Sequence, residues 1–249
     1  VSSLGGEKSM IADFSDGSQL ITQVGESPFA FYGFEAGEVF STQEDADAAG
    51  LVSYNGNSFQ AGDIHFADRN GDHVIDDADR TILGSATPDF FGGFYTGFRY
   101  RGLELSALFS YSYGNEIYNV TRRNLESLDG FINQTETAAR RWNNYGQITD
   151  MPRANYGDPA GNNRFSSRWI EDGSYLKLKN VTLSYTFPRE LSFIRQLQIY
   201  LSGDNLLTFT KYLGLDPEFS WSYSSQLQGI DQGKIPTASS VRLGVKLNF

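Results

Sequence analysis

The sequence predicts an all-β fold, namely antiparallel strands of a large transmembrane β-barrel with long loops. Three observations support this prediction. Apolar and polar residues alternate strictly in several segments of about ten residues. The connections between these segments are alternately short and long, as in outer-membrane barrels. Gly, Phe and Tyr, with 26, 19 and 14 of the 249 residues, favour strands and turns over helices.

Composition and charge exclude several classes of protein. Asp and Glu number 30 against 20 Lys and Arg, so the overall field repels phosphate and no nucleic-acid partner is expected. The chain has no cysteine, which excludes disulfides and thiolate metal sites. It contains no apolar run long enough for a membrane-spanning helix and no intact signal-peptide pattern at its start. The common motifs of hydrolases and nucleotide-binding enzymes are missing, so the chain is not expected to be an enzyme.

Residues 1–88 are expected to form one long excursion at the loop end of the barrel. An aromatic stretch occupies residues 27–40, and the segment STQEDADAAG at 41–50 predicts a short helix. Residues 89–249 are expected to hold the barrel strands. A domain boundary is therefore predicted between residues 88 and 89.

Five segments have the alternation of barrel strands: 89–100, 103–113, 174–187, 197–203 and 240–249. In the last, Val241, Leu243, Val245, Leu247 and Phe249 share one face, which is expected to contact outer-membrane lipid. The apolar phase of 174–187 shifts between Leu178 and Val181, which indicates a bulge near Asn180. Five strands are too few to close a transmembrane barrel, which needs about eight. The residues predicted to face the barrel lumen are Arg99, Glu104, Gln198, Arg242 and Lys246.

The long connections, 114–172 and 206–238, are predicted to be extracellular loops. In the first, Asn133 followed by Glu136 resembles a capping box and predicts a helix carrying Ala138, Ala139 and Trp142. Loop aromatics suit stacking on sugars or packing against a partner, although they also serve as local packing anchors. The candidate substrate-binding or partner-binding residues are Trp142, Tyr212, Trp221 and Tyr223.

The segment DRNGDHVIDDAD at 68–79 has the spacing of a calcium loop. Calcium prefers hard oxygen ligands, and the alternative is an acidic turn that binds nothing. His73 stands where glycine eases the turn, and the carboxylate at the last position is shorter than the usual Glu, so binding is expected to be weak. The predicted metal ligands are Asp68, Asn70, Asp72, the Val74 carbonyl, Asp76 and Asp79.

Several motifs in collinear order, from about Phe29 to Phe249, resemble the C-terminal part of a SusC-like (RagA-like) TonB-dependent outer-membrane transporter. One is GDIHFADRNGDHVIDDADRTILGSATPDFFGGF, with Gly62, Asp63 and Ile64 at its start. The others are RRWNNYGQITDMPRAN, DGSYLKLKNVTLSYTFP, NLLTFTKYLGLDPE and the ending from Gly229 to Phe249. His73 and Ile235 depart from the pattern, where the family commonly has Gly and Tyr.

The resemblance implies an importer of oligosaccharides or peptides in the bacterial outer membrane. It also implies two partners, a SusD-like surface lipoprotein and TonB, the latter acting through a plug domain and TonB box that these 249 residues do not include. A second interpretation of the same strands is a soluble calcium-binding β-sandwich that acts as an extracellular adhesion or binding module. A hydrolase is the third.

Overall fold

A computed structural model describes residues 1–188, 194–218 and 227–249, which form two compact units. The loop unit comprises Val1–Thr87, Glu116–Glu171 and Ser220–Gly233. The sheet unit comprises Pro88–Asn115, Asp172–Phe219 and Lys234–Phe249. The boundary predicted after residue 88 therefore lies one residue earlier. The segment 114–172, predicted as a loop between barrel strands, folds almost entirely with the first 87 residues.

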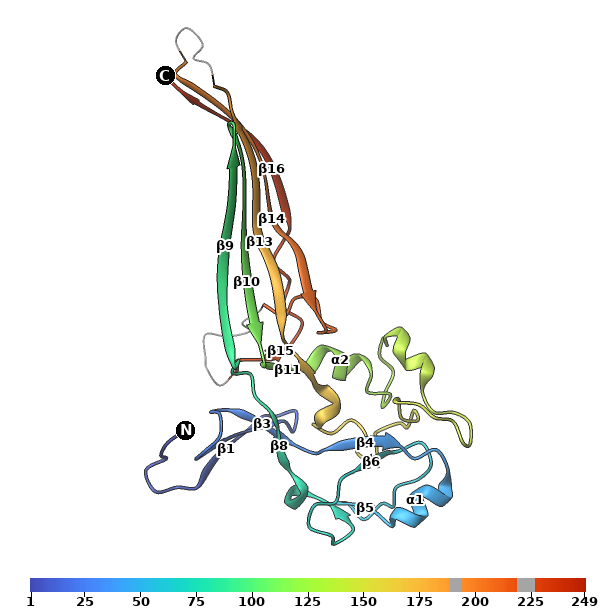
Figure 1. Ribbon diagram of the computed structural model, residues 1–249. Helices are drawn as coiled ribbons and strands as arrows, with labels where there is room; N and C mark the ends of the chain where they lie inside the picture. Colours follow the sequence, from blue (N-terminus) through green and yellow to red (C-terminus); the bar gives the residue numbers. More distant parts are fainter. Residues whose placement is uncertain (189–193, 219–226) are drawn as a thin grey trace. The chain divides into compact units, whose positions relative to one another are not determined.

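The sheet unit contains a single antiparallel sheet of five long strands (Figure 1). Their order across the sheet is β16-β14-β13-β10-β9. Among the described residues of this unit no second sheet faces it, which removes the β-sandwich alternative. The strands are β9 (Phe90–Tyr100), β10 (Leu103–Tyr113), β13 (Tyr175–Thr186), β14 (Gln196–Thr210) and β16 (Ser240–Asn248). Strand β14 runs past residue 206, so the second long connection begins later than predicted.

The local sequence explains the turn between β9 and β10 and the position of a bulge in β13. Arg101 and Gly102 connect β9 to β10 in a two-residue hairpin turn. Their φ angles are 46° and 87°, and this type of turn requires positive φ at both residues. Against β10, Asn180 pairs with Leu108 and Leu178 pairs with the next residue, Phe109, so the register shifts at this point of β13. This confirms the predicted bulge and gives Lys179 as the extra residue.

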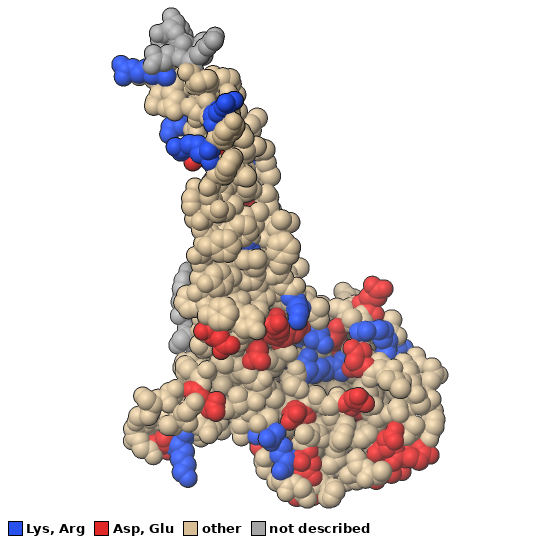
Figure 2. Space-filling model, viewed as in Figure 1, with Lys and Arg blue, Asp and Glu red and all other residues tan. Residues whose placement is uncertain are grey.

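The strand registers place apolar residues on one face throughout the sheet. Leu105 lies opposite Phe98 on one side and Leu183 on the other, and Leu183 lies opposite Leu201, which lies opposite Leu243. The rings of Phe94 and Phe109 stack on this face with centroids 4.7 Å apart. In Figure 2 the middle of the sheet is almost free of charged atoms. We call this side, which also carries Val241, Val245 and Leu247, the apolar face.

The loop unit is built from short strands in small sheets. A four-stranded sheet, ordered β1-β2-β3-β8, consists of β1 (Ser9–Asp13), β2 (Gln19–Gln23), β3 (Ala30–Gly33) and β8 (Thr81–Gly84). A three-stranded sheet, ordered β12-β11-β15, consists of β11 (Glu116–Asn119), β12 (Ile170–Asp172) and β15 (Ile230–Asp231). Two strand pairs complete it: β4 (Ala36–Val39) with β6 (Ile64–Phe66), and β5 (Val52–Ser53) with β7 (Val74–Ile75).

Two main apolar clusters form the core of the loop unit. One gathers Phe34, Phe59, Phe66 and Ile75 between the paired short strands, and Trp142 packs against it. The other joins distant segments of the chain and consists of Leu20, Phe31, Tyr118, Phe165, Trp169 and Ile230. The second cluster shows why segments from three parts of the sequence fold together, since none could bury its apolar side chains alone.

Helices are short and confined to the loop unit. The predicted helix at 41–50 is confirmed as α1 (Gln43–Ala49), with the Thr42 side chain accepting from the Asp45 N–H at its start and Gly50 in the left-handed conformation at its end. Helix α2 (Val120–Leu125) was not predicted. The capping-box helix is corrected to η2, a 3₁₀-helix at Glu136–Arg140 that begins after Thr135 and ends before Trp142. The remaining 3₁₀-helices are η1 (Asp77–Asp79) and η3 (Ser167–Trp169). No helix in the described part of the chain is long and apolar enough to cross a membrane.

Candidate functional site

The five residues predicted to face a lumen lie together on the face of the sheet opposite the apolar face. Glu104 is paired with Arg99 on β9, and Gln198 is paired with Lys246 on β16. Arg242 lies further along the same side of β16. We call this side the polar face. The Arg99 guanidinium contacts the Glu104 carboxylate at 2.8 Å, and the Gln198 amide donates to the Ser184 hydroxyl at 3.1 Å.

A buried ion-pair cluster, which the sequence analysis missed, covers part of the polar face beside the bulge. Lys177 is only 1% exposed, and its ammonium contacts Asp216 at 2.8 Å and Glu218 at 3.2 Å. Lys179, the bulge residue, contacts Glu218 at 2.8 Å. Two strand lysines thus hold the segment that follows β14 against the sheet. The alternation of Lys177 and Lys179 in the sequence indicated a charged face, but nothing local identified their partners.

Asp204 organises a second set of polar contacts across three neighbouring strands. It accepts hydrogen bonds from the Asn180 amide at 2.7 Å and the Ser240 hydroxyl at 3.1 Å, and it pairs with Arg242. Asn180 also accepts from the Thr182 hydroxyl. Asn180, Asp204 and Arg242 on this face therefore have partners within the sheet.

The acidic loop at 68–79 folds around its own backbone. Asp68 accepts from the N–H groups of Gly71 and His73 at 2.7 and 2.9 Å, and the His73 hydrogen bond is the main cause that holds the pKa of Asp68 below its usual value. Asp72 accepts from the Val74 N–H at 2.8 Å. His73 has a φ of 63°, the left-handed conformation that favours glycine at this position of a calcium loop.

The last two predicted calcium ligands serve the local fold in this structure. Asp79 is fully buried and accepts from the N–H groups of Arg69 and Asp76, at 2.8 and 3.0 Å. Asp76 caps η1 by accepting from the Ala78 N–H. The part of the chain that the structure describes holds no group of three or more His, Cys, Asp or Glu residues arranged for a metal ion. Calcium binding by this loop stays a prediction.

The predicted binding aromatics divide into two groups. Trp142 packs against the core of the loop unit, and its indole N–H donates to the Ser41 carbonyl at 3.2 Å. Tyr212 is buried, with 5% of its surface exposed. Both side chains are therefore placed as packing anchors, which was the alternative role considered for them. Trp221 and Tyr223 lie outside the described residues.

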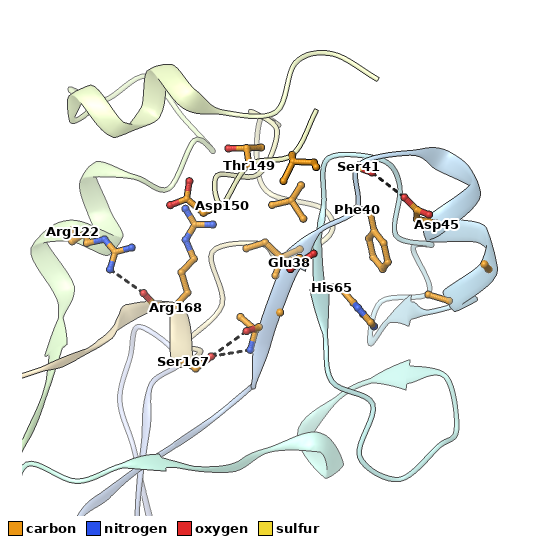
Figure 3. A pocket seen from close by; sticks show the side chains of 17 residues that line it. Glu38, Phe40, Ser41, Asp45, His65, Arg122, Thr149, Asp150, Ser167 and Arg168 are labelled. Carbon is orange, nitrogen blue, oxygen red and sulfur yellow. Dashed lines mark hydrogen bonds between the residues drawn. The ribbon is translucent and has the colours of Figure 1, made fainter. Parts of the chain in front are cut away.

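A groove of about 910 Å³ lies within the loop unit (Figure 3). Residues 36–41 line it along β4 and the segment that follows, and side chains from α1, β6, α2, η3 and residues 148–150 complete it. In Figure 3, Arg122 and Arg168 lie on one side of Glu38, whereas Phe40, His65 and Asp45 lie on the other. The groove thus has a basic side and an aromatic, acidic side. No single sequence motif marked it, because its residues come from six separate segments.

Contacts beneath the groove fix its walls. The Ser167 hydroxyl accepts from the Ala36 N–H at 2.9 Å, which ties η3 to β4. Asp63, at the start of β6, is fully buried and receives two hydrogen bonds from Arg153, at 2.8 and 3.0 Å. Gly62 has a φ of 87°, and a Cβ added there would lie 2.6 Å from the Trp142 ring. Gly62 and Asp63 of the Gly62-Asp63-Ile64 motif therefore stabilise the packing behind the groove.

The chain is similar in sequence to TonB-dependent receptors. No family model matches the chain. TonB-dependent receptor P3 of Formosa agariphila is 34% identical over 238 residues, which cover 92% of this chain and 23% of that protein. The TonB-dependent receptor SusC of Bacteroides thetaiotaomicron is 26% identical over 234 residues, which cover 88% of this chain and 22% of SusC.

Solved structures give the same result for the fold. The RagAB peptide importer in its open-open state matches 99% of this chain with a TM-score of 0.74 and 24% identity. The RagAB peptide transporter matches 98% of this chain with a TM-score of 0.73 and 25% identity. Each match covers 25% of the chain in the solved structure. The five-stranded sheet is accordingly part of a transmembrane β-barrel, as predicted. The chain spans about a quarter of the length of these relatives and belongs to the family of TonB-dependent receptors, which are outer-membrane proteins.

Proposed function

We propose that this chain forms part of the barrel wall and the outward-facing loops of an importer for peptides or oligosaccharides. The observation that carries this proposal is the division of the five-stranded sheet into an apolar face and a polar face. Leu243 on the apolar face is 76% exposed and Leu201 is 47% exposed, so water is a poor environment for that side. Outer-membrane lipid would cover it, and the polar face would line a water-filled lumen.

The charged groups of the polar face support this orientation. An ionised side chain is costly in the hydrocarbon of a bilayer, whereas the ion pairs Arg99–Glu104 and Arg242–Asp204 are compatible with a wet interior. The Lys177–Asp216 pair draws the segment after β14 over this face. Part of the connection would then narrow the lumen rather than extend away from it.

Peptides are the better supported of the two solute classes. Relatives of similar fold are described as a peptide importer and a peptide transporter. An oligosaccharide site commonly uses exposed aromatic rings, and two of the four candidates, Trp142 and Tyr212, are engaged in packing. The family resemblance further implies TonB as the source of energy and a SusD-like lipoprotein as the surface partner.

Uptake by intact cells tests the proposal. The gene of the full-length receptor is deleted in its host, and uptake of labelled peptide and oligosaccharide mixtures is measured with and without a protonophore. We expect deletion to abolish uptake of one solute class, uptake to return with the restored gene, and the protonophore to abolish it. Unchanged uptake of both classes after deletion would contradict an import function.

A further inference from the structure

Arg168 is an under-compensated cation in the wall of the groove. Its Nε is buried and has no hydrogen-bond partner among the described residues, and it forms no salt bridge with any Asp or Glu that the structure describes. One of its terminal nitrogens contacts the Met151 sulfur, which is a weak acceptor. Burial, with the neighbouring charge of Arg122 as a second cause, lowers the pKa of Arg168 to about 10.

The neighbouring groups hold this guanidinium in place, and the nearby carboxylates of Glu126 and Asp150 favour its charge without forming an ion pair with it. Arg168 lies over the Trp169 ring at 4.8 Å, and Arg122 lies over the same ring at 5.4 Å. Arg122 is paired with Glu126 and Glu171, at 3.1 and 2.9 Å. Asp150, on the groove wall, pairs instead with Arg140 at 3.3 Å. An anion entering the groove would therefore find a desolvated, preorganised guanidinium.

We propose that this groove binds the C-terminal carboxylate of an extended peptide, with Arg168 as the anion-binding residue. The proposal rests on the function inferred above, with peptides as the imported solute. A guanidinium offers a planar pair of N–H donors that matches a carboxylate, and such charge-assisted hydrogen bonds are strong where water is excluded.

The strand beside Arg168 favours a peptide as the bearer of this carboxylate. Strand β4 pairs with β6 alone among the described strands. The Ser167 hydroxyl occupies its second edge at Ala36, and beyond Ala36 that edge has no strand partner along the groove. The Phe40 N–H donates to the Asp63 carbonyl on the β6 side, and the Val39 carbonyl of the same peptide unit therefore points to that second edge. Main-chain pairing at a strand edge together with capture of a terminal carboxylate is a recurring mode of peptide recognition.

The opposite side of the groove indicates which peptide side chains the groove would prefer. Asp45 lines this side beyond Glu38, together with the rings of Phe40 and His65, whose centroids lie 4.9 Å apart at an interplanar angle of 31°. A peptide whose carboxylate contacts Arg168 would bring its preceding residues toward these groups. Aromatic or basic residues are therefore favoured upstream of the terminal residue.

The test measures binding to the full-length receptor, purified with any lipoprotein that accompanies it. Titration calorimetry compares pentaalanine that has a free C-terminus with the same peptide as its C-terminal amide. Since a hydrogen-bonded charge is worth about 1.5–3 kcal/mol, we expect the acid to bind roughly tenfold tighter or more. Arg168→Gln should remove this preference, whereas Arg141→Gln, an exposed arginine that does not line the groove, should retain it.

Equal affinity of acid and amide for the wild-type receptor would overturn the proposal, as would a preference that survives Arg168→Gln. Arg168-dependent binding of trigalacturonate without binding of either peptide would assign the groove to an acidic sugar instead. If Arg168→Gln fails to fold, a photoreactive pentapeptide acid decides: cross-links at residues 36–50 or 148–150 support the proposal, and cross-links elsewhere overturn it. Cells that import peptides through a receptor without acid preference would show that the groove proposal fails while the import function stands.

Discussion

Asp63 and Lys177 are both buried, and each is compensated by specific partners. The Asp63 carboxylate accepts from the Gln60 N–H, the Asn162 amide and two nitrogens of Arg153. The Lys177 ammonium contacts two carboxylates. A buried charge that has no partner is costly in free energy, so each of these charges requires its partners to stay in place. Asp63 and Lys177 therefore hold together segments that are distant in sequence. Arg168 differs because its buried Nε has no hydrogen-bond partner among the described residues.

Removing Lys177 should destabilise the sheet unit strongly. Lys177→Ala leaves Asp216 in a buried position without its cation, which costs about 3–5 kcal/mol in the free energy of unfolding. Lys179→Ala is the matched control, since that side chain is 31% exposed and its loss should cost about 1 kcal/mol or less. Denaturant unfolding of the full-length receptor measures both. Equal losses for the two variants would show that burial of Lys177 has no energetic consequence.

Calcium should order the acidic loop if its carboxylates bind the ion. With about 10⁻³ M calcium, protease cleavage within residues 63–88 is expected to slow in the wild type and to stay fast in Asp72→Ala. Asp47→Ala, an exposed acidic residue of α1, serves as the control and should behave as the wild type. A cleavage rate in the wild type that does not respond to calcium would leave the loop as an acidic turn.

Single residues were predictable from the sequence only where their role is local. The spacing of Asp68, Asn70 and Asp72 correctly placed them in one loop, since such turns depend on hydrogen bonds to nearby backbone. Lys177 and Asp216 are 39 residues apart, and no local pattern pairs them. The same holds for Arg168 and the strand it faces. The candidate groove therefore could not be derived from the sequence.

At the scale of elements, strand faces were predicted well because alternation is a local property. The period of two assigned Val241, Leu243 and Val245 to one face and Arg242 and Lys246 to the other, and the registers confirm this division. The phase shift in 174–187 also located the bulge. Helix η2 was misassigned because the Thr135 and Thr137 hydroxyls contact Glu126, a tertiary constraint that a capping pattern does not reveal.

An arginine on the apolar face should impair barrel stability. Val245→Arg is expected to lower the free energy of unfolding by about 2–4 kcal/mol if the residue lies near the middle of the bilayer. Lys246→Gln, its neighbour on the polar face, should change it much less. Denaturant unfolding of the reconstituted receptor measures the free energy of unfolding of each variant, and heat-modifiable migration in gel electrophoresis shows whether each barrel is folded. A larger loss for Lys246→Gln than for Val245→Arg would reverse the assignment of the two faces.

At the scale of the molecule, the motif series identified the family, whereas the division into units came from the structure. Segments 1–87 and 116–171 fold together because Phe31, Phe165 and Trp169 share one core, and the pairing of β11 with β15 adds the third segment of the unit. These contacts join residues that are far apart in sequence. The sequence pattern is local to each segment and therefore assigns 1–88 and 114–172 to separate loops. The sheet unit, by contrast, is built from neighbouring hairpins and alternating strands, and its five strands were predicted.

The orientation of the five-stranded sheet in the outer membrane is the central claim, and cysteine accessibility tests it most directly. This chain has no cysteine of its own, so Arg242→Cys, Leu243→Cys, Val245→Cys and Lys246→Cys can be made singly in a full-length receptor freed of other cysteines. A membrane-impermeant maleimide and a lipid-soluble maleimide are then applied to the receptor in membranes. We predict that the impermeant reagent labels positions 242 and 246, and that only the lipid-soluble reagent labels positions 243 and 245. Labelling of all four positions by the impermeant reagent would contradict a sheet with one face in lipid and one in the lumen.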